Sequence, residues 1–265
     1  MASPRRRFSQ NFLHDAAVIQ RMLMTLAAGT DETFLEIGPG RGALTEPLLK
    51  AGVALKVIEI DRDLAAALSA RHGHNPQLEV IVGDALRYPL AQARPESGRL
   101  RVIGNLPYNL STPLLFHLTD HLDGIEDLHL LLQREVVTRM AADPGSRDYG
   151  RLSVMLQYRC QVEALFDVSP GAFYPAPQVT SSFVRLRPHP TPPTEPIDEQ
   201  CLSQVVARAF GQRRKTLRNA LRGLLERADI QAADIDPAIR PEQIDLAGYA
   251  RLARQLASVQ AEPHG

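Results

Sequence analysis

Short apolar runs alternate with amphipathic stretches along the first two thirds of the chain. Each run is an almost unbroken series of Leu, Ile and Val, which is typical of strands buried on both faces of a parallel sheet. We expect such strands at 33–38, 55–60, 78–82, 100–104 and 128–133. Helical patterns separate them at 43–51, 63–72 and 113–121. This alternation predicts an α/β fold with a doubly wound sheet.

Two more strand patterns follow a predicted helix at 150–158. They span residues 162–168 and 181–186, and the proline-rich stretch 173–177 separates them. Strand patterns joined by such a turn predict an antiparallel hairpin at one edge of the sheet. The expected sheet therefore has seven strands.

A proline-rich segment divides the chain. Residues 188–196 contain five prolines in nine positions, which excludes a helix or a central strand. Beyond it the patterns are helical, at 198–210, 215–227 and 241–258. We therefore expect an α/β domain over 1–187, a linker over 188–196 and a small all-helical domain over 197–265.

Composition excludes several classes of protein. The chain has 30 basic and 30 acidic residues, so its overall charge does not indicate a nucleic-acid partner. Cys160 and Cys201 form no Cys/His ligand pattern, which argues against a metal. No apolar run approaches the roughly 20 residues of a membrane span, and no apolar segment follows the basic N-terminus. We expect a cytoplasmic monomer without a metal.

A glycine-rich turn follows the first predicted strand, with Gly38, Gly40 and Gly42. Glycines let the backbone approach a ligand closely, and the N–H groups of the following helix would face that ligand. The pattern also fits a dinucleotide-binding turn, and by itself it equally describes a tight strand–helix connection.

Acidic residues follow the next two strands. Glu59 could accept hydrogen bonds from ribose hydroxyls. Asp84 could accept from the amine of an adenine, or could cap a helix. Because the carboxyl ends of neighbouring parallel strands meet at one edge of a sheet, these signals together favour a nucleotide-like cofactor site.

The fourth strand is followed by Asn105-Leu106-Pro107-Tyr108. Methylation of adenine N6 needs acceptors for the amine hydrogens, because the nitrogen lone pair is conjugated with the ring. Asn105 offers an amide oxygen, and Leu106, held extended by the following proline, offers a carbonyl. Tyr108 offers a ring on which a base can stack. Taken alone these residues describe a β-turn, but behind a cofactor turn they predict methyl transfer driven by positioning.

These motifs resemble those of the class I S-adenosylmethionine-dependent methyltransferases, which have a Rossmann-like fold. The whole chain is similar to the ribosomal RNA adenine dimethyltransferases, in QNFL at 10–13, NLPY at 105–108, YGRLSV at 149–154 and FYPAPQV at 173–179. The resemblance implies dimethylation of N6 of two adjacent adenosines in the 3′-terminal hairpin loop of 16S RNA, in the 30S particle. It also implies S-adenosylmethionine as cofactor and a role in small-subunit biogenesis.

Carried over by position, the resemblance implies cofactor contacts at Asn11, Leu13, Gly38, Gly40, Glu59, Ile60, Asp84, Ala85 and Asn105. It implies that the target base meets Asn105, Leu106, Pro107 and Tyr108, with Phe173 as the opposite wall. One departure is visible, since Gln178 and Thr180 stand where the family often has lysine and aspartate. That departure concerns a backbone contact and leaves the base pocket intact.

A basic segment at 208–227 holds seven basic residues against one acidic residue, Glu226. On a single helix Arg214, Arg218 and Arg222 would form one stripe. Such a stripe is typical of phosphate binding, although a solvated helix face gives the same pattern. We predict RNA binding at Arg5, Arg6, Arg7, Arg213, Arg214, Lys215, Arg218 and Arg222.

Three other functions are compatible with parts of this pattern. A 23S ribosomal RNA adenine methyltransferase that confers antibiotic resistance would share the 10–13 and 105–108 motifs. A DNA adenine methyltransferase usually has proline where this chain has Leu106. A non-catalytic ribosome assembly factor would use the fold only to hold RNA.

Overall fold

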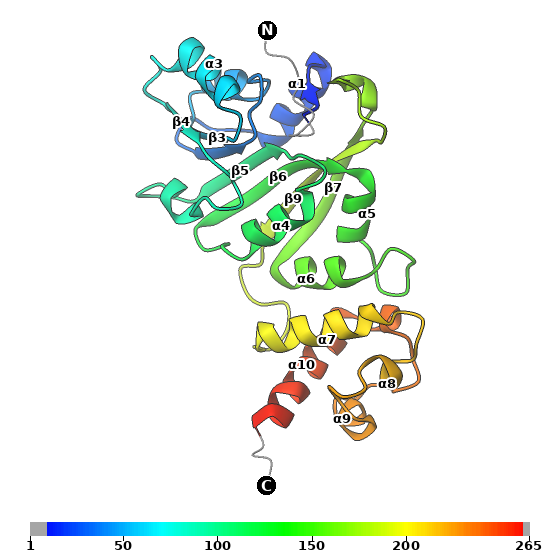
Figure 1. Cartoon of the computed structure of the whole chain (residues 1–265). Coiled ribbons are helices and arrows are strands. Elements are labelled where there is room, and N and C mark those ends of the chain that lie inside the picture. Colours follow the sequence, from blue (N-terminus) through cyan, green and yellow to red (C-terminus); the bar gives the residue numbers. More distant parts are fainter. Residues whose placement is uncertain (1–9, 262–265) are drawn as a thin grey trace. The chain divides into compact units, whose positions relative to one another are not determined.

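A computed structural model of the chain describes residues 10–261. Its larger sheet has seven strands (Figure 1), which are β2 Thr33–Ile37, β3 Ala54–Glu59, β4 Leu78–Val82, β5 Leu100–Asn105, β6 Ile125–Gln133, β7 Cys160–Val168 and β9 Ser181–Pro188. They lie in the order β4-β3-β2-β5-β6-β9-β7. The expected seven-stranded α/β sheet is confirmed.

Five neighbouring strands, β2 to β6, pair in parallel. β9 pairs with β6 in the antiparallel direction, with Gln133 opposite Ser181. Most predicted strand bounds are correct within two residues, but β6 begins at Ile125, three residues before the predicted start. The parallel arrangement brings the carboxyl ends of β2 to β5 to one edge of the sheet, where ligands bind in this architecture.

Three helices connect parallel strands, namely α2 Thr45–Lys50, α3 Arg62–His72 and α4 Ser111–Thr119. Helix α1 (Ala16–Leu26) precedes β2, and α5 (Arg134–Met140) follows β6. The sequence patterns predicted α2, α3 and α4 but did not reveal α1 and α5. A carboxylate begins α1, because Asp15 accepts hydrogen bonds from the N–H groups of Ala17 and Val18 at 2.9 and 3.1 Å.

A second, two-stranded sheet joins residues far apart in the chain. β1 (Phe12–Leu13) pairs in the antiparallel direction with β8 (Phe173–Tyr174). Sequence analysis predicted a turn at 173–177, and no pattern indicated β1. Two-residue strands carry no periodicity, so only the pairing itself defines them.

The chain forms two compact units. One contains the residues up to Val137 together with Glu163–Pro188, and the other contains Thr138–Val162 and the residues from His189 on. One boundary between the units falls after Pro188, where the proline-rich segment begins. The second unit also takes in Thr138–Val162, which sequence analysis placed in the α/β domain.

The second unit has its own core. Its helices are α6 Arg151–Arg159, α7 Glu199–Gly211, α8 Leu217–Ala220, α9 Arg227–Ala232 and α10 Leu246–Ala261. The ring of Phe210 on α7 lies 6.1 Å from that of Tyr149 and 5.7 Å from that of Tyr249 on α10. This aromatic contact joins Tyr149, which precedes α6, to the helices beyond the linker, and so explains why 138–162 belongs to this unit.

The predicted single helix at 215–227 is wrong. The segment forms two short helices, α8 and α9, and the turn between them contains Gly223 at φ +77°. Leu221 and Leu225 are buried at this turn, so packing of the turn replaces the expected continuous apolar face. In the described part of the chain, no helix is long and apolar enough to cross a membrane.

Candidate active site

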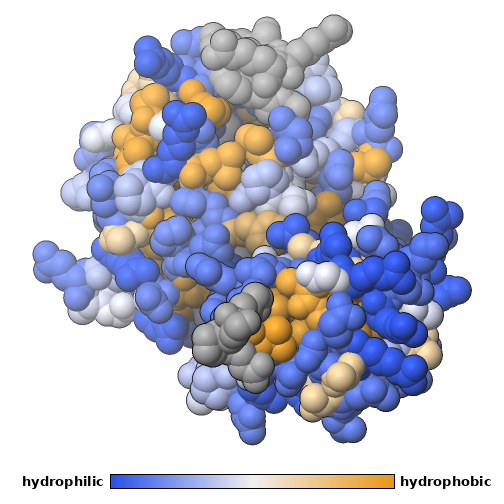
Figure 2. All heavy atoms as spheres, turned by 60° about the horizontal axis from the view of Figure 1, so that its bottom comes forward, coloured by the Kyte–Doolittle hydropathy of each residue, from blue (hydrophilic) through white to orange (hydrophobic). Residues whose placement is uncertain are grey.

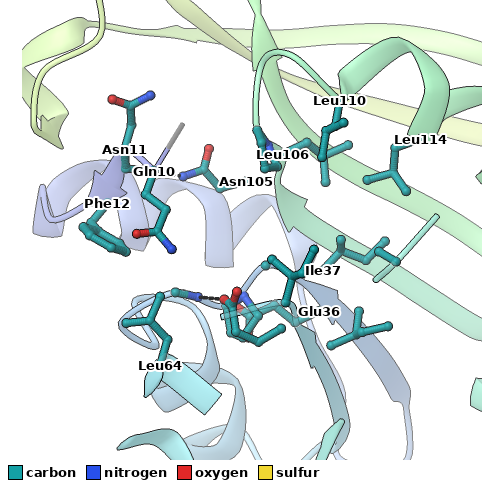
Figure 3. Close-up of a pocket in the computed structure, with 18 of the residues that line it drawn as sticks. Gln10, Asn11, Phe12, Glu36, Ile37, Leu64, Asn105, Leu106, Leu110 and Leu114 are labelled. Atoms are coloured by element: carbon teal, nitrogen blue, oxygen red, sulfur yellow. Dashed lines mark hydrogen bonds between the residues drawn. The ribbon is translucent and has the colours of Figure 1, made fainter. Parts of the chain in front are cut away.

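A pocket opens at the carboxyl ends of β2, β3, β4 and β5. The N-terminal segment with Gln10, Asn11 and Phe12 forms one side, and Leu106, Leu110 and Leu114 form another, with Asn105 between them (Figure 3). All the residues predicted to contact the cofactor line it, namely Asn11, Leu13, Gly38, Gly40, Glu59, Ile60, Asp84, Ala85 and Asn105. Leu106, Pro107 and Tyr108 also line it.

The glycine-rich turn requires its glycines. Gly38 and Gly40 have φ values of +66° and +56°, a region that favours glycine. A Cβ atom on Gly40 would lie 3.1 Å from the Phe12 ring. The turn therefore packs closely under β1, and its backbone faces the pocket.

Three contacts hold the N-terminal segment over the pocket. Gln10 Nε2 donates to Asp61 Oδ2 at 3.3 Å. The Arg41 guanidinium lies 4.5 Å from the centre of the Phe12 ring, which is a cation–π distance. The side chain of Asn105 donates to the carbonyl of Asn11 at 3.0 Å. The N-terminal segment therefore forms one wall of the pocket.

Glu59 is a buried carboxylate at the end of β3. Its Oε2 accepts from the N–H of Gly40, and its Oε1 accepts from the N–H of Asp61, each at 3.0 Å. Burial raises the pKa of Glu59 more than these two backbone hydrogen bonds lower it. The bonds fix the carboxylate so that its remaining lone pairs can accept from a ligand.

Glu36 is a second buried carboxyl of the pocket wall, and sequence analysis gave it no role. It is 2% exposed and accepts a hydrogen bond from Thr45 Oγ1 at 2.6 Å. Burial, with a smaller contribution from the charge of Glu59, raises the pKa of Glu36 to about 7, against the lowering effect of Thr45. Its place directly before the glycine-rich turn was the signal that could have identified it.

Asn105 has a fixed amide orientation. The Asn11 carbonyl oxygen can only accept a hydrogen bond, so the atom of Asn105 that faces it is the amide nitrogen. The amide oxygen therefore points elsewhere and is the acceptor that the site can offer to a ligand. Leu106 is fixed as well, since its N–H donates to the Leu131 carbonyl at 3.2 Å.

A residue of β9 holds the Tyr108 ring in place. The Tyr108 hydroxyl lies 2.7 Å from Ser181 Oγ, and Ser181 itself is fully buried. Burial raises the pKa of Tyr108 more than the Ser181 hydrogen bond lowers it, so the phenol is neutral near pH 7. Ser181 thus positions an aromatic ring of the site, a role that sequence analysis did not assign.

Phe173 does not line the pocket. It is 2% exposed and packs in the apolar core with Leu13, which lies opposite it in the two-stranded sheet. Its neighbour Tyr174 is 60% exposed. Phe173 is thus covered in this structure, and its role as the opposite wall for the base stays a prediction.

Asp84 precedes a turn and not a helix, so it is not the helix cap considered for it, while its predicted contact with adenine stays a prediction. It lines the pocket, and its Oδ1 accepts from the N–H of Leu86 at 3.0 Å, as in a local turn cap. Its other oxygen lies 3.8 Å from Arg87 Nε. Among residues 10–261 no group of three or more His, Cys, Asp or Glu could hold a metal ion.

The predicted RNA-binding residues differ in their solvent exposure and contacts. Arg214, Lys215, Arg218 and Arg222 are exposed in and around α8. Figure 2 shows strongly hydrophilic side chains gathered on the side of the C-terminal unit where Figure 1 places α8 and α9. Arg213 is partly buried and donates to the Ser146 carbonyl at 3.2 Å. Arg5, Arg6 and Arg7 lie outside the described residues.

The strand order, the antiparallel β9 and the pocket at the carboxyl ends of β2 to β5 define a class I S-adenosylmethionine-dependent methyltransferase fold. A dimethyladenosine transferase from Plasmodium falciparum has the same fold, with a TM-score of 0.80 at 23% identity over 93% of this chain and 98% of that chain. The 23S rRNA methyltransferase ErmE matches with a TM-score of 0.72 at 25% identity, over 93% of this chain and 100% of ErmE.

Residues 1–258 match the family model described as ribosomal RNA adenine dimethylase. A ribosomal RNA small subunit methyltransferase A from Pseudomonas aeruginosa is 54% identical, over 96% of this chain and 95% of its own length. A relative of the same name from Methylococcus capsulatus is 51% identical, over 96% and 98%. The chain belongs to the ribosomal RNA adenine dimethylase family, and the expected enzyme class, an rRNA adenine dimethyltransferase, is confirmed.

Proposed function

We propose that the chain dimethylates N6 of two adjacent adenosines in the 3′-terminal hairpin loop of 16S ribosomal RNA, in the 30S particle. Relatives that are 54% and 51% identical along nearly their full length have small-subunit names, which supports this substrate. The observation that carries the chemistry is the fixed amide of Asn105 at the pocket. By this proposal the enzyme acts in the cytoplasm and serves small-subunit biogenesis.

The pocket residues fit S-adenosylmethionine, which supplies an electrophilic methyl group when bound. Gly38 and Gly40 let the cofactor approach the backbone, because neither carries a side chain. The buried Glu59 carboxylate suits the ribose hydroxyls. Ile60, which is 44% exposed, offers an apolar surface for the adenine ring, next to Asp84 and Ala85 for its polar edge. Asn11 and Leu13 close the cofactor site from the N-terminal side.

The target adenine meets the residues after β5. Asn105 Oδ1 and the Leu106 carbonyl accept hydrogen bonds from its N6 amine and so direct the nitrogen lone pair towards the methyl group. The base stacks on Tyr108, whose ring is held through Ser181. The neutral phenol and amide require no proton transfer before reaction, so the rate comes from positioning.

The exposed basic residues around α8 suit the RNA backbone. Arg214, Lys215, Arg218 and Arg222 are exposed in the C-terminal unit, which we propose as the RNA-binding part. Arg213 is partly engaged with Ser146 and Glu242 and contributes less. Phosphate contacts of this kind give salt-dependent attraction, while the flipped base selects the site.

Methyl transfer to isolated particles tests the proposal. The chain is incubated with radiolabelled S-adenosylmethionine and either undermethylated 30S or 50S particles, and the nucleosides are then analysed. We expect N6,N6-dimethyladenosine in 16S RNA and none in 23S RNA. Transfer to 50S particles alone would favour the 23S enzyme, and no transfer by a cofactor-bound chain would favour a non-catalytic assembly factor.

The same assay tests the role of Asn105. Asn105→Ala removes an acceptor for the amine, and we expect kcat to fall by about 100-fold or more. Asn75→Ala, in the connection between α3 and β4, should keep wild-type activity. Full activity of Asn105→Ala would disprove the proposed chemistry.

A further inference from the structure

Tyr174 has an unusual environment for an aromatic side chain. It is 60% exposed and is the one aromatic residue among the large exposed apolar residues of the described chain. Aromatic rings usually gain stability by burial, so an exposed ring at a defined position suggests a binding role. Pro175 and Pro177 follow it and restrict the backbone that presents it.

The two-stranded sheet places Tyr174 next to a residue that lines the pocket. Residues directly opposite each other in an antiparallel pair project from the same face. Leu13 and Phe173 form one such pair and both belong to the apolar core, although Leu13 also lines the pocket. Phe12 and Tyr174 form the other, and Phe12 lines the pocket above Gly40. Tyr174 therefore lies beside Phe12, a residue that lines the pocket, and projects from the same face of the two-stranded sheet.

The segment that begins at Tyr174 ends at a residue that contacts Tyr108 of the pocket. It runs to Ser181, whose Oγ lies 2.7 Å from the Tyr108 hydroxyl. Its first residue, Tyr174, is paired with Phe12 of the pocket wall. Its last residue, Ser181, holds the Tyr108 ring, which is proposed to stack on the target base. The second exposed apolar residue of this segment is Val179, which is 43% exposed.

We infer that Tyr174 is a second stacking platform, which binds the nucleobase next to the adenosine that occupies the pocket. This inference rests on the proposed function. When one base of a single-stranded loop is flipped into a pocket, its neighbour loses a stacking partner, which costs a few kcal/mol. An exposed tyrosine beside the pocket replaces that partner and lowers the free-energy cost of base flipping.

The adjacency of the two target adenosines gives this platform a specific use. While one adenosine is in the pocket, the other stacks on Tyr174, and the two can then exchange places. Tyr174 therefore acts as a positioning residue for a pair of adjacent purines. Phe173, buried in the core, anchors β8.

Kinetics of three variants test the inference on undermethylated 30S particles. For Tyr174→Ala we expect a fall of about 5- to 150-fold in kcat/KM for the particle, the equivalent of one base–aromatic stack. Tyr174→Phe should stay near wild type, because stacking uses the ring and not the hydroxyl. Val179→Ala is the matched control on the same segment and should also stay near wild type.

Two further measurements separate a positioning role from a loss of structure. Because Tyr174 is exposed, Tyr174→Ala should keep the wild-type unfolding midpoint and the wild-type Kd for S-adenosylmethionine. Unchanged kcat/KM for Tyr174→Ala would overturn the inference, as would equal losses in Tyr174→Phe or in Val179→Ala. A wild-type chain that is inactive on 30S particles would instead disprove the proposed function.

Discussion

At the scale of single residues, the site depends on a hydrogen bond across 94 positions of the chain. Asn105 was identifiable from its place after a strand and a glycine-rich turn. Its amide orientation was not, because the partner carbonyl belongs to Asn11. The same holds for Tyr108, whose ring is held by Ser181, 73 positions away. Local sequence indicates which residue types are present, whereas distant contacts orient them.

Glu36 leads to a prediction about stability and pH. Its pKa rises from 4.5 to about 7 on folding, because it is buried. The stability that the raised pKa contributes is fully present below pH 4.5 and is lost as the pH rises through 7. Above pH 7 the folded chain must hold an ionised carboxylate in a buried position. The shift corresponds to about 3 kcal/mol. Glu36→Gln should therefore unfold at a higher temperature than wild type at pH 8, and the difference should disappear near pH 4.5.

Thermal unfolding at several pH values measures this effect. Glu96→Gln, at an exposed carboxylate, is the control and should leave the unfolding curve unchanged throughout. If Glu36→Gln were no more stable than wild type at pH 8, ionisation of Glu36 in the folded chain would carry no such cost.

At the scale of elements, the strands were predictable and the small pairings were not. Long apolar runs determine β2 to β6, because each run must be buried on both faces. β1 and β8 have two residues each, so their existence depends on mutual pairing. This pairing decides that Phe173 enters the core while Tyr174 is exposed, a difference that no local pattern indicated.

A substitution at Gly104 tests whether the fold requires the close approach of β2 and β5. Gly104 lies in β5 opposite Ile37 of β2, and a Cβ atom there would be 2.9 Å from the Ile37 carbonyl oxygen. Gly104→Ala should destabilise the fold by about 1–3 kcal/mol and, by shifting Asn105, reduce methyl transfer. Urea unfolding and the particle assay measure the two effects.

A matched substitution controls for the general effect of removing a glycine. Gly171 has no atom within 4 Å of its added Cβ, so Gly171→Ala should change stability by less than about 1 kcal/mol. Equal stability of Gly104→Ala and wild type would mean that β2 and β5 separate without cost.

At the scale of the whole molecule, charge is balanced overall and concentrated locally. Because basic and acidic residues are equal in number, net charge gives no general attraction to RNA. The exposed residues Arg214, Arg218 and Arg222 lie around the short helix α8, although not on the continuous helix that was predicted. A local surface of this kind can bind phosphates without a helical stripe.

Salt dependence measures the contribution of this surface. Replacing Arg214, Arg218 and Arg222 by Ala should weaken binding to 30S particles and reduce the slope of log K against log salt by about 2 to 3. Replacing Lys50 and Arg99 by Ala removes exposed charge that lies outside the C-terminal unit, before β3 and β5, and should leave the slope unchanged. An unchanged slope for the triple variant would show that the surface does not contact RNA.

The sequence by itself determined the seven strands and the motifs that supply many of the residues lining the pocket. These features follow from local patterns, because burial and backbone restriction act on neighbouring residues. Only the tertiary structure decided the orientation of Asn105, the burial of Phe173, the roles of Glu36 and Ser181, and the inclusion of 138–162 in the helical unit. Each of these depends on contacts between residues distant in the chain, which no local pattern records.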